Sequence, residues 1–379
     1  MDDPLDRMFR DYDGARMSRR DLLRALGLVA FAAPAVSFAQ GRGQDSTGRG
    51  GRGNRAPADT THAPVPFEPT GWKTVWLDHI TYRCTDYPKA AAFYTAVMGW
   101  KLRSDDGKQA VMDIGEDSGA VGGVILTNGY VAPPPPPPPQ PGDTAGRGGG
   151  GRGGGAPRPP RNAAITNFCW GIEPWDTNKV EAALKQRGLN PVADHAGSDF
   201  KSFHVKDPDG FDIQVSNGTK ANRRKGAANA KLASPLPFEP TGWKTSWLDH
   251  ISYGCSDYKR TVAFYESLLS WVPGRFAGNQ SIVDAGDVGG AIIRNRAGGM
   301  TSIDHISFGI DGFDPDKVEA ELMKRGLGSP SRQDPAHLQV DTGGGGDIHT
   351  SKFKSYHTPD AFGWDLQISN ITRVNRHDT

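Results

Sequence analysis

The sequence predicts an α+β protein made of four βαβββ modules that pair into two domains. Residues 64–79 recur almost unchanged as residues 235–250, at an offset of 171 (250 − 79). Such self-similarity at a fixed period indicates a duplicated structural unit. Each half of each copy then shows a short strand rich in β-branched and aromatic residues, a helical segment, and two or three further strands.

Length and charge limit the number of domains and the kinds of partner that such a chain can have. A chain of 379 residues holds two or three domains of ordinary size. Its 44 Lys and Arg balance 43 Asp and Glu, for a formal net charge of +1. This balance gives no reason to expect nucleic acid as a partner.

Three cysteines are too few, and odd in number, for a disulfide framework. Cys84 and Cys255 occupy matched places in the two copies, each in a strand-like run after a histidine. We favour the interpretation that both are small buried core residues. A bridge between them is the alternative in an exported protein.

The first 39 residues have the organisation of a signal peptide. Arg19 and Arg20 precede an apolar run over residues 25–36, and the segment ends in a small-x-small pattern at Ala39. The arginine pair resembles the twin-arginine export signal. The alternative is an amphipathic N-terminal helix, and the apolar run is short for a membrane span. We expect export by the twin-arginine pathway, cleavage after Ala39, a periplasmic or extracytoplasmic location, and no stable membrane insertion afterwards.

Low-complexity tracts divide the remaining chain. Residues 40–63 are Gly/Arg-rich, residues 131–162 contain seven consecutive prolines and then Gly/Arg repeats, and residues 219–234 are polar and basic. Such tracts bury too little apolar surface to offset their ordering entropy, so we expect them to be disordered. They delimit a first domain over 64–218, with 131–162 as a surface-loop insertion, and a second over 235–379.

The elements follow in order along each copy. Strands that carry a histidine are expected at Trp76–Cys84, Trp247–Cys255 and Ile303–Ile310. Helices are expected at Tyr87–Met98, Thr177–Gln186, Tyr258–Leu269 and Asp314–Lys324, the second and fourth ending at Gly188 and Gly326. Further strands are expected at Gln109–Ile114, Val121–Thr127, Lys201–Val205 and Phe211–Val215.

The motifs Leu-Asp-His-Ile at 77–80, Ala-Phe-Tyr at 92–94, Gly-Trp at 99–100 and the Asp-Pro-Asp-Gly run from 207 carry a family resemblance. The chain resembles the vicinal oxygen chelate superfamily, which includes glyoxalase I, the extradiol dioxygenases and the fosfomycin and bleomycin resistance proteins. The resemblance implies that two modules form a cup around a divalent metal. In the extradiol dioxygenases two cups lie in tandem and the second keeps the metal.

Carried onto this chain, the resemblance implies a metal site of Fe, Mn or Zn at His250, His305 and Gln367. Gln367 falls where the family has a Glu, which removes one negative charge and weakens the site for a hard cation. Asp365 lies two residues earlier, on the same strand face, and could supply a carboxylate if the strand shifts.

The first cup keeps only one ligand histidine. Its matched residues are His79, Asn167 and Gln214. We therefore expect a metal in the second copy and none at His79.

Two further histidines of the second copy are candidates for proton transfer. His357 stands where the extradiol enzymes have an active-site Tyr, and His349 lies near the position of their acid–base His. In the first copy their counterparts are His204 and His195. The alternative is that these histidines are structural strand and loop residues.

Three functions are consistent with this pattern. The retained pair His250 and His305 favours a metal-dependent enzyme, dioxygenase-like or lyase-like, that acts on a substrate with vicinal oxygens. The loss of the Glu from both cups favours a protein that binds a small molecule without turnover, as bleomycin resistance proteins do. A structural protein that uses the duplicated sheet for assembly is the third.

Overall fold

The computed structural model describes residues 63–115, 121–132, 161–195, 197, 199–222, 230–296, 301–331 and 333–376. The signal peptide, most of the Pro/Gly insertion and parts of both linkers predicted above therefore lie outside the described residues. Among the described residues, no helix is long and apolar enough to cross a membrane.

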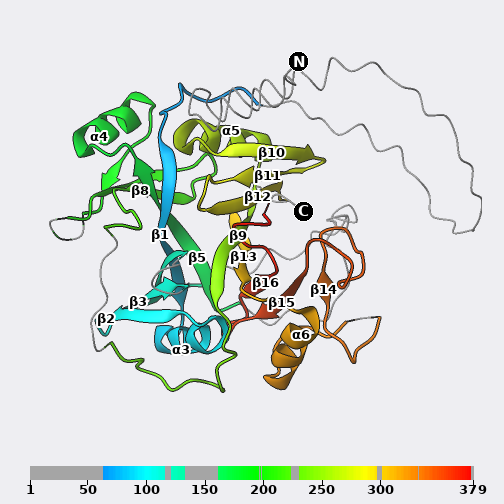
Figure 1. The fold of residues 1–379 in the computed structure, drawn as a ribbon. Coiled ribbons are helices and arrows are strands. Elements are labelled where there is room, and N and C mark those ends of the chain that lie inside the picture. The colour runs from blue at the N-terminus through cyan, green and yellow to red at the C-terminus, as the bar shows by residue number, and fades with distance from the viewer. Residues whose placement is uncertain are drawn as a thin grey trace, which may run out of the picture. The chain divides into compact units, whose positions relative to one another are not determined.

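Four βαβββ modules make up the described chain, as predicted (Figure 1). The first copy contains β1 (Lys73–Cys84), α3 (Tyr87–Met98), β2 (Lys101–Asp105), β3 (Gln109–Ile114), β4 (Gly122–Asn128), β5 (Ala163–Glu173), α4 (Thr177–Gln186), β6 (Val192–Ala193), β7 (Ser202–Lys206) and β8 (Asp212–Ser216). The second contains β9 (Thr245–Cys255), α5 (Tyr258–Leu269), β10 (Val272–Ala277), β11 (Gln280–Asp284), β12 (Gly289–Asn295), β13 (Ser302–Ile310), α6 (Pro315–Lys324), β14 (Val340–Asp341), β15 (Ser355–Pro359) and β16 (Asp365–Ser369).

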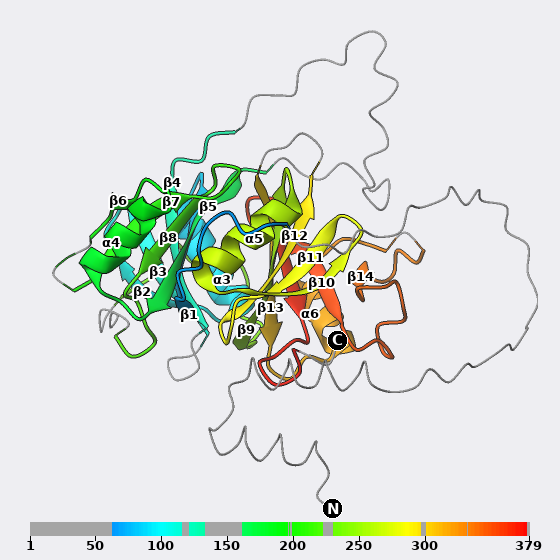
Figure 2. The same cartoon turned by 90° about the horizontal axis from the view of Figure 1, so that it is seen from above.

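Each copy forms one eight-stranded sheet. The strand order is β2-β3-β4-β1-β5-β8-β7-β6 in the first and β10-β11-β12-β9-β13-β16-β15-β14 in the second. The first strands of the two modules, β1 with β5 and β9 with β13, pair antiparallel at the centre. Both modules of a copy therefore contribute to one continuous sheet, and Figure 2 shows the blue-to-green sheet beside the yellow-to-red one.

The helices begin where the sequence predicts because each has an aspartate N-cap. The side chains of Asp86, Asp176, Asp257 and Asp314 accept hydrogen bonds from backbone N–H groups of the first turn. This contact satisfies donors that the helix itself leaves open. Gly188 and Gly326 follow α4 and α6 with φ of 73° and 67°, a left-handed conformation that ends a helix.

The two faces of each sheet differ in chemistry. In the second sheet one face carries apolar side chains such as Ile251, Ile306 and Leu366, all 2% exposed or less. The opposite side, which we call the polar face, carries His250, Ser252, His305, Ser307, Ser355, His357, Asp365 and Gln367. Strand alternation produces this division, since residues two apart share a face.

The two copies contact each other through reciprocal hydrogen bonds. Tyr82 and Tyr94 of the first copy both donate to Asp360 Oδ2 of the second. At the matched place Tyr253 of the second copy donates to Asp207 of the first. The same residue types thus meet twice with the copies exchanged, as in an isologous dimer interface.

Tryptophans of both copies continue this interface. Trp100 Nε1 donates to Thr245 Oγ1 at 3.1 Å, and Trp271 Nε1 donates to Thr74 Oγ1 at 3.0 Å. Each indole also lies edge-on to an aromatic ring of the other copy, Phe308 at 5.3 Å and Trp170 at 5.2 Å between centroids. These buried donors are satisfied only when the copies are docked.

Candidate functional site

Four neighbouring strands bring the histidines of the second copy together. His250 of β9 is paired in register with Ser307 of β13, Ser307 with Gln367 of β16, and Gln367 with His357 of β15. His305 lies two residues before Ser307 and therefore shares its face. The structure thus places His250, His305, His357 and Gln367 on the polar face.

A β-bulge orients His250. The register between β9 and β13 shifts between Leu248 and His250, so that Asp249 and His250 both lie opposite Ser307. Asp249 Oδ2 accepts from Ser307 Oγ at 2.8 Å and lies 3.2 Å from His250 Nδ1. A carboxylate on Nδ1 fixes the ring and leaves Nε2 available, the arrangement common around metal-binding histidines.

The two predicted ligand histidines face each other. His250 Nε2 lies 3.1 Å from His305 Nε2. The His305 ring is also 4.9 Å from the His357 ring, and His305, His357 and Asp365 each offer a ligand atom within 4.8 Å of the others. Asp365 therefore lies close to the histidines without the strand shift that the sequence analysis invoked.

Only one of the two polar atoms of the Gln367 side chain has a hydrogen-bond partner among the described residues. Its Nε2 donates to Ser355 Oγ at 2.7 Å. Its Oε1 is buried and has no hydrogen-bond partner among the described residues. A buried carbonyl oxygen without a donor costs free energy, and a cation or a ligand donor at this point would remove that cost.

His357 is held between two carboxylates. Its Nδ1 lies 3.1 Å from Asp365 Oδ1 and its Nε2 lies 3.6 Å from Asp341 Oδ2. Burial lowers the pKa of His357, but Asp341 and Asp365 outweigh it and raise the pKa to about 9. His357 in turn lowers the pKa of Asp341 to about 2. The imidazole is thus set up to hold a proton at neutral pH.

His349 takes a different position. Its Nε2 lies 3.7 Å from Asp316 Oδ1 of helix α6, and its side chain is 56% exposed. From the same loop, Phe353 lies 6.5 Å from the His250 ring between centroids. The structure thus brings Phe353, rather than His349, beside the histidine pair.

The first copy repeats part of this arrangement. His204 lies 3.1 Å from Asp212 and 3.3 Å from Asp194, as His357 does between Asp365 and Asp341. Asn167 stands at the place of His305 and accepts from Thr81 Oγ1. His195 Nδ1 accepts from the backbone N–H of Ser202, a structural contact.

Three sets of residues at the two sites were not predicted from the sequence. Cys169 is the register partner of His79, and strand alternation from Asn167 would have placed it there. Asp194 and Asp341 both contact the matched histidines, but they stand 10 (204 − 194) and 16 (357 − 341) residues before them, so the offset between the copies does not pair them. Asp78 and its counterpart Asp249 have no sequence signal, since regular alternation assigns them to the opposite face.

Comparison with known proteins identifies the fold. Residues 76–215 match the Glyoxalase/Bleomycin resistance protein/Dioxygenase superfamily. No curated protein matches the sequence.

Solved structures match a larger part of the chain. A Mn(II)-bound glyoxalase from Novosphingobium aromaticivorans has a TM-score of 0.52 and 14% identity, over 79% of this chain and 82% of that one. An extradiol ring-cleaving dioxygenase from B. fuscum has a TM-score of 0.51 and 15% identity, over 83% of this chain and 75% of that one. Residues 76–215 of the first copy are therefore similar to the glyoxalase, bleomycin resistance protein and dioxygenase superfamily, and the chain has the two-domain α+β fold of the extradiol dioxygenases.

Proposed function

We propose that this protein is a metal-dependent enzyme whose active site is the polar face of the second sheet, and that it acts on a small substrate with two vicinal oxygens. The observation that carries the proposal is the approach of His250 Nε2 to His305 Nε2 beside the unpartnered Oε1 of Gln367. Imidazole and oxygen donors in one place suit Fe, Mn or Zn.

The residues divide into two ligand sets that share His305. One is His250, His305 and Gln367, and the other is His305, His357 and Asp365. When bound, the metal would supply Lewis acidity to the substrate oxygens. If the first set binds the metal, His357 keeps its proton between Asp341 and Asp365. If the second set binds it, His357 must give up that proton and bind through one ring nitrogen. The Phe353 ring lies 6.5 Å from the His250 ring and gives the site an apolar neighbour.

A second function rests on a separate observation. His204 lies between two carboxylates, as His357 does, but in its copy Asn167 replaces His305. A feature shared by both copies is not specific to catalysis in one of them. A protein that binds the same class of ligand without turnover is therefore the alternative.

The two functions are separated by binding and turnover measurements on the mature protein. Metal content is measured after exposure to Fe, Mn and Zn, and catechol, a simple compound with vicinal oxygens, is titrated by calorimetry. Metal-dependent catechol binding with oxygen uptake or product formation supports the enzyme. Binding without turnover of catechol or other vicinal-oxygen compounds supports the alternative, and a wild-type protein that takes up no more metal than His305→Ala contradicts the enzyme.

Replacing Gln367 by Glu should strengthen the metal site. The added carboxylate restores the negative charge that the family has at this position. The Ser355 hydroxyl, which accepts from Gln367 Nε2 and donates to the backbone oxygen of Asp341, can turn its O–H toward the carboxylate. We expect about tenfold tighter binding of Mn²⁺, which corresponds to about 1.4 kcal/mol. Gln214→Glu is the matched control, because Asn167 leaves the first copy without the second histidine, and Mn²⁺ binding should not change. Equal or weaker binding by Gln367→Glu would exclude Gln367 from the ligand set.

Export by the twin-arginine pathway is also a proposal, supported by residues 18–39. Replacing Arg19 and Arg20 together by Lys should leave the precursor uncleaved in the cytoplasm, because the pathway reads the arginine pair. The measurement is the size and the fraction of the protein after cell fractionation. Arg16→Lys lies outside the pair and serves as control. Cleaved, exported protein from the double variant would contradict this route.

A further inference from the structure

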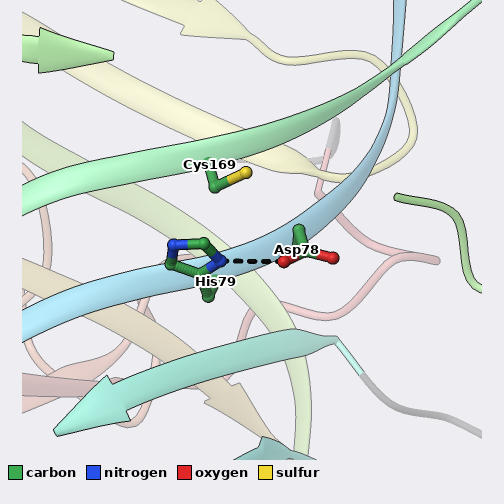
Figure 3. A group of neighbouring side chains, drawn as sticks. All are labelled: Asp78, His79 and Cys169. Atoms are coloured by element: carbon green, nitrogen blue, oxygen red, sulfur yellow. Dashed lines mark hydrogen bonds and ion pairs between the residues drawn. The ribbon is translucent and has the colours of Figure 1, made fainter. Parts of the chain in front are cut away.

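The first copy contains a second group of side chains that could hold a metal ion. Asp78, His79 and Cys169 each offer a ligand atom, and these atoms all lie within 4.8 Å of one another. Figure 3 shows the three side chains between β1, which carries Asp78 and His79, and β5, which carries Cys169. His79 Nδ1 lies 2.8 Å from Asp78 Oδ1.

The same bulge as in the second copy creates this group. The register of β1 against β5 shifts between Leu77 and His79, and His79 pairs with Cys169. Asp78 is thereby turned to the face of His79. In the second copy Ser307 occupies the place of Cys169 and donates to Asp249. The first copy thus differs at this point by a thiol in place of a hydroxyl.

Asp78 is more exposed than its counterpart in the second copy. A Cβ on Gly218 would lie 2.5 Å from Asp78 Oδ2, whereas the second copy has the buried Ile371 at the position of Gly218. The Asp78 side chain is 22% exposed and its counterpart Asp249 is 12% exposed. Asp78 is the most exposed of the three side chains, so an ion would have to approach from the Asp78 side.

In contrast to the expectation from the sequence that no metal binds at His79, we propose that Asp78, His79 and Cys169 bind a divalent cation of the Zn²⁺ class. Thiolate, imidazole and carboxylate together are a donor set of Zn²⁺ sites, and thiolate disfavours Mg²⁺ and Ca²⁺. The negative charges of Asp78 and of the Cys169 thiolate balance the charge of the ion. The proposal does not depend on the function of the second copy, since no residue is shared.

Binding requires that Cys169 lose its proton. Burial, followed by the charge of Asp78, raises the pKa of Cys169 well above its ordinary value, so the metal-free protein holds a neutral thiol there. The cation takes the thiolate electron pair and the proton passes to solvent. Metal uptake by this site should therefore release a proton and become tighter as the pH rises.

Co²⁺ added to the reduced, metal-free full chain tests the site. A thiolate ligand gives Co²⁺ an intense near-ultraviolet charge-transfer band, which nitrogen and oxygen ligands do not. The three cysteines of the chain are the only possible sources. We expect the band in the wild type and in His305→Ala, and its displacement by Zn²⁺.

Cys169→Ser is the decisive variant, because Ser307 shows that the fold accepts serine at this position. It should lose the band and bind Zn²⁺ at this site at least about 100-fold more weakly, since loss of an outer-shell partner alone costs 10- to 100-fold. Cys84 is a buried cysteine at the end of β1, and Cys84→Ala should keep both the charge-transfer band and the affinity for Zn²⁺. No band in the wild type, or a band that survives Cys169→Ser, would overturn the proposal. Because His305→Ala removes the second-copy site only, failure of one site is distinguishable from failure of the other.

Discussion

His305→Ala is expected to abolish metal binding by the second copy. His305 is common to the two possible ligand sets, with His250 and Gln367 on one side and His357 and Asp365 on the other. Its loss therefore removes a ligand whichever set is used. We expect at least about 100-fold weaker binding of Mn²⁺, and a stoichiometry lower by one metal per chain.

Thermal unfolding gives an independent measure of the same effect. A ligand present at 100 times its Kd stabilises the native state by about 2.7 kcal/mol. Mn²⁺ should therefore raise the Tm of the wild type and leave that of His305→Ala unchanged. Asn167→Ala is the matched change in the first copy and should keep the Mn²⁺ response. A His305→Ala protein that still gains stability from Mn²⁺ would show that the metal lies elsewhere.

His250→Ala and Asp365→Asn then distinguish the two ligand sets. If His250 and Gln367 complete the site, His250→Ala loses the metal and Asp365→Asn keeps most of the affinity. If His357 and Asp365 complete it, Asp365→Asn loses the metal and His250→Ala keeps most of the affinity. Both variants retain side chains that the strands accommodate, so their Tm without metal is the control for folding.

The helices were predictable from the sequence to within one residue. Their boundaries are set by local chemistry, an aspartate that caps the first turn and, after α4 and α6, a glycine that adopts positive φ. Repetition of these signals in four modules also made the fold class predictable. Strand ends were less certain, since β1 begins at Lys73 and not at Trp76 because its pairing with β5 extends to Glu173.

The sites were predictable only where strand alternation is regular. It places His305 and Gln367 on one face and would have placed Cys169 beside them. The bulges in β1 and β9 break the alternation, and no residue in the sequence predicts them. Asp78 and Asp249 were missed for that reason. His349 lies in a loop, where spacing along the chain does not fix the direction of a side chain.

The interface between the copies had no sequence signal beyond the repeated residues themselves. Tyr82 and Tyr253, and Asp207 and Asp360, recur at matched places. Which tyrosine meets which aspartate depends on how two sheets dock, and that is a property of the whole fold. Only the structure shows that each contact joins one copy to the other.

Asp360→Ala is expected to destabilise the protein by at least about 3 kcal/mol. The Asp360 side chain accepts from the hydroxyls of Tyr82 and Tyr94 and from the backbone N–H groups of Phe362 and Trp364. Asp360 is 6% exposed, so water cannot replace all of these acceptors. Each buried donor left without an acceptor costs about 1–3 kcal/mol. Urea unfolding followed by fluorescence measures the loss.

The pH dependence of stability identifies Asp360 as a buried acid. Burial raises the pKa of Asp360 above its ordinary 3.8, although its hydrogen-bond donors oppose this. The folded protein therefore binds this proton more tightly than the unfolded chain, and the free energy of unfolding contributed by Asp360 falls as the pH rises from 3.8 through the folded pKa. Asp360→Asn cannot take up this proton, so its free energy of unfolding should lack this part of the dependence on pH.

Asp207→Ala is the matched change on the other side of the interface. Among the described residues one tyrosine, Tyr253, donates its hydroxyl to Asp207, whereas two tyrosines donate to Asp360. One fewer buried hydroxyl loses its acceptor, so the loss of stability should be about 1–3 kcal/mol smaller than for Asp360→Ala. Tyr82→Phe, which leaves Asp360 with Tyr94 and two backbone donors, should cost less than either. Equal losses for Asp360→Ala and Tyr82→Phe would mean that Asp360 stabilises the interface through Tyr82 alone, and not as the shared acceptor of both copies.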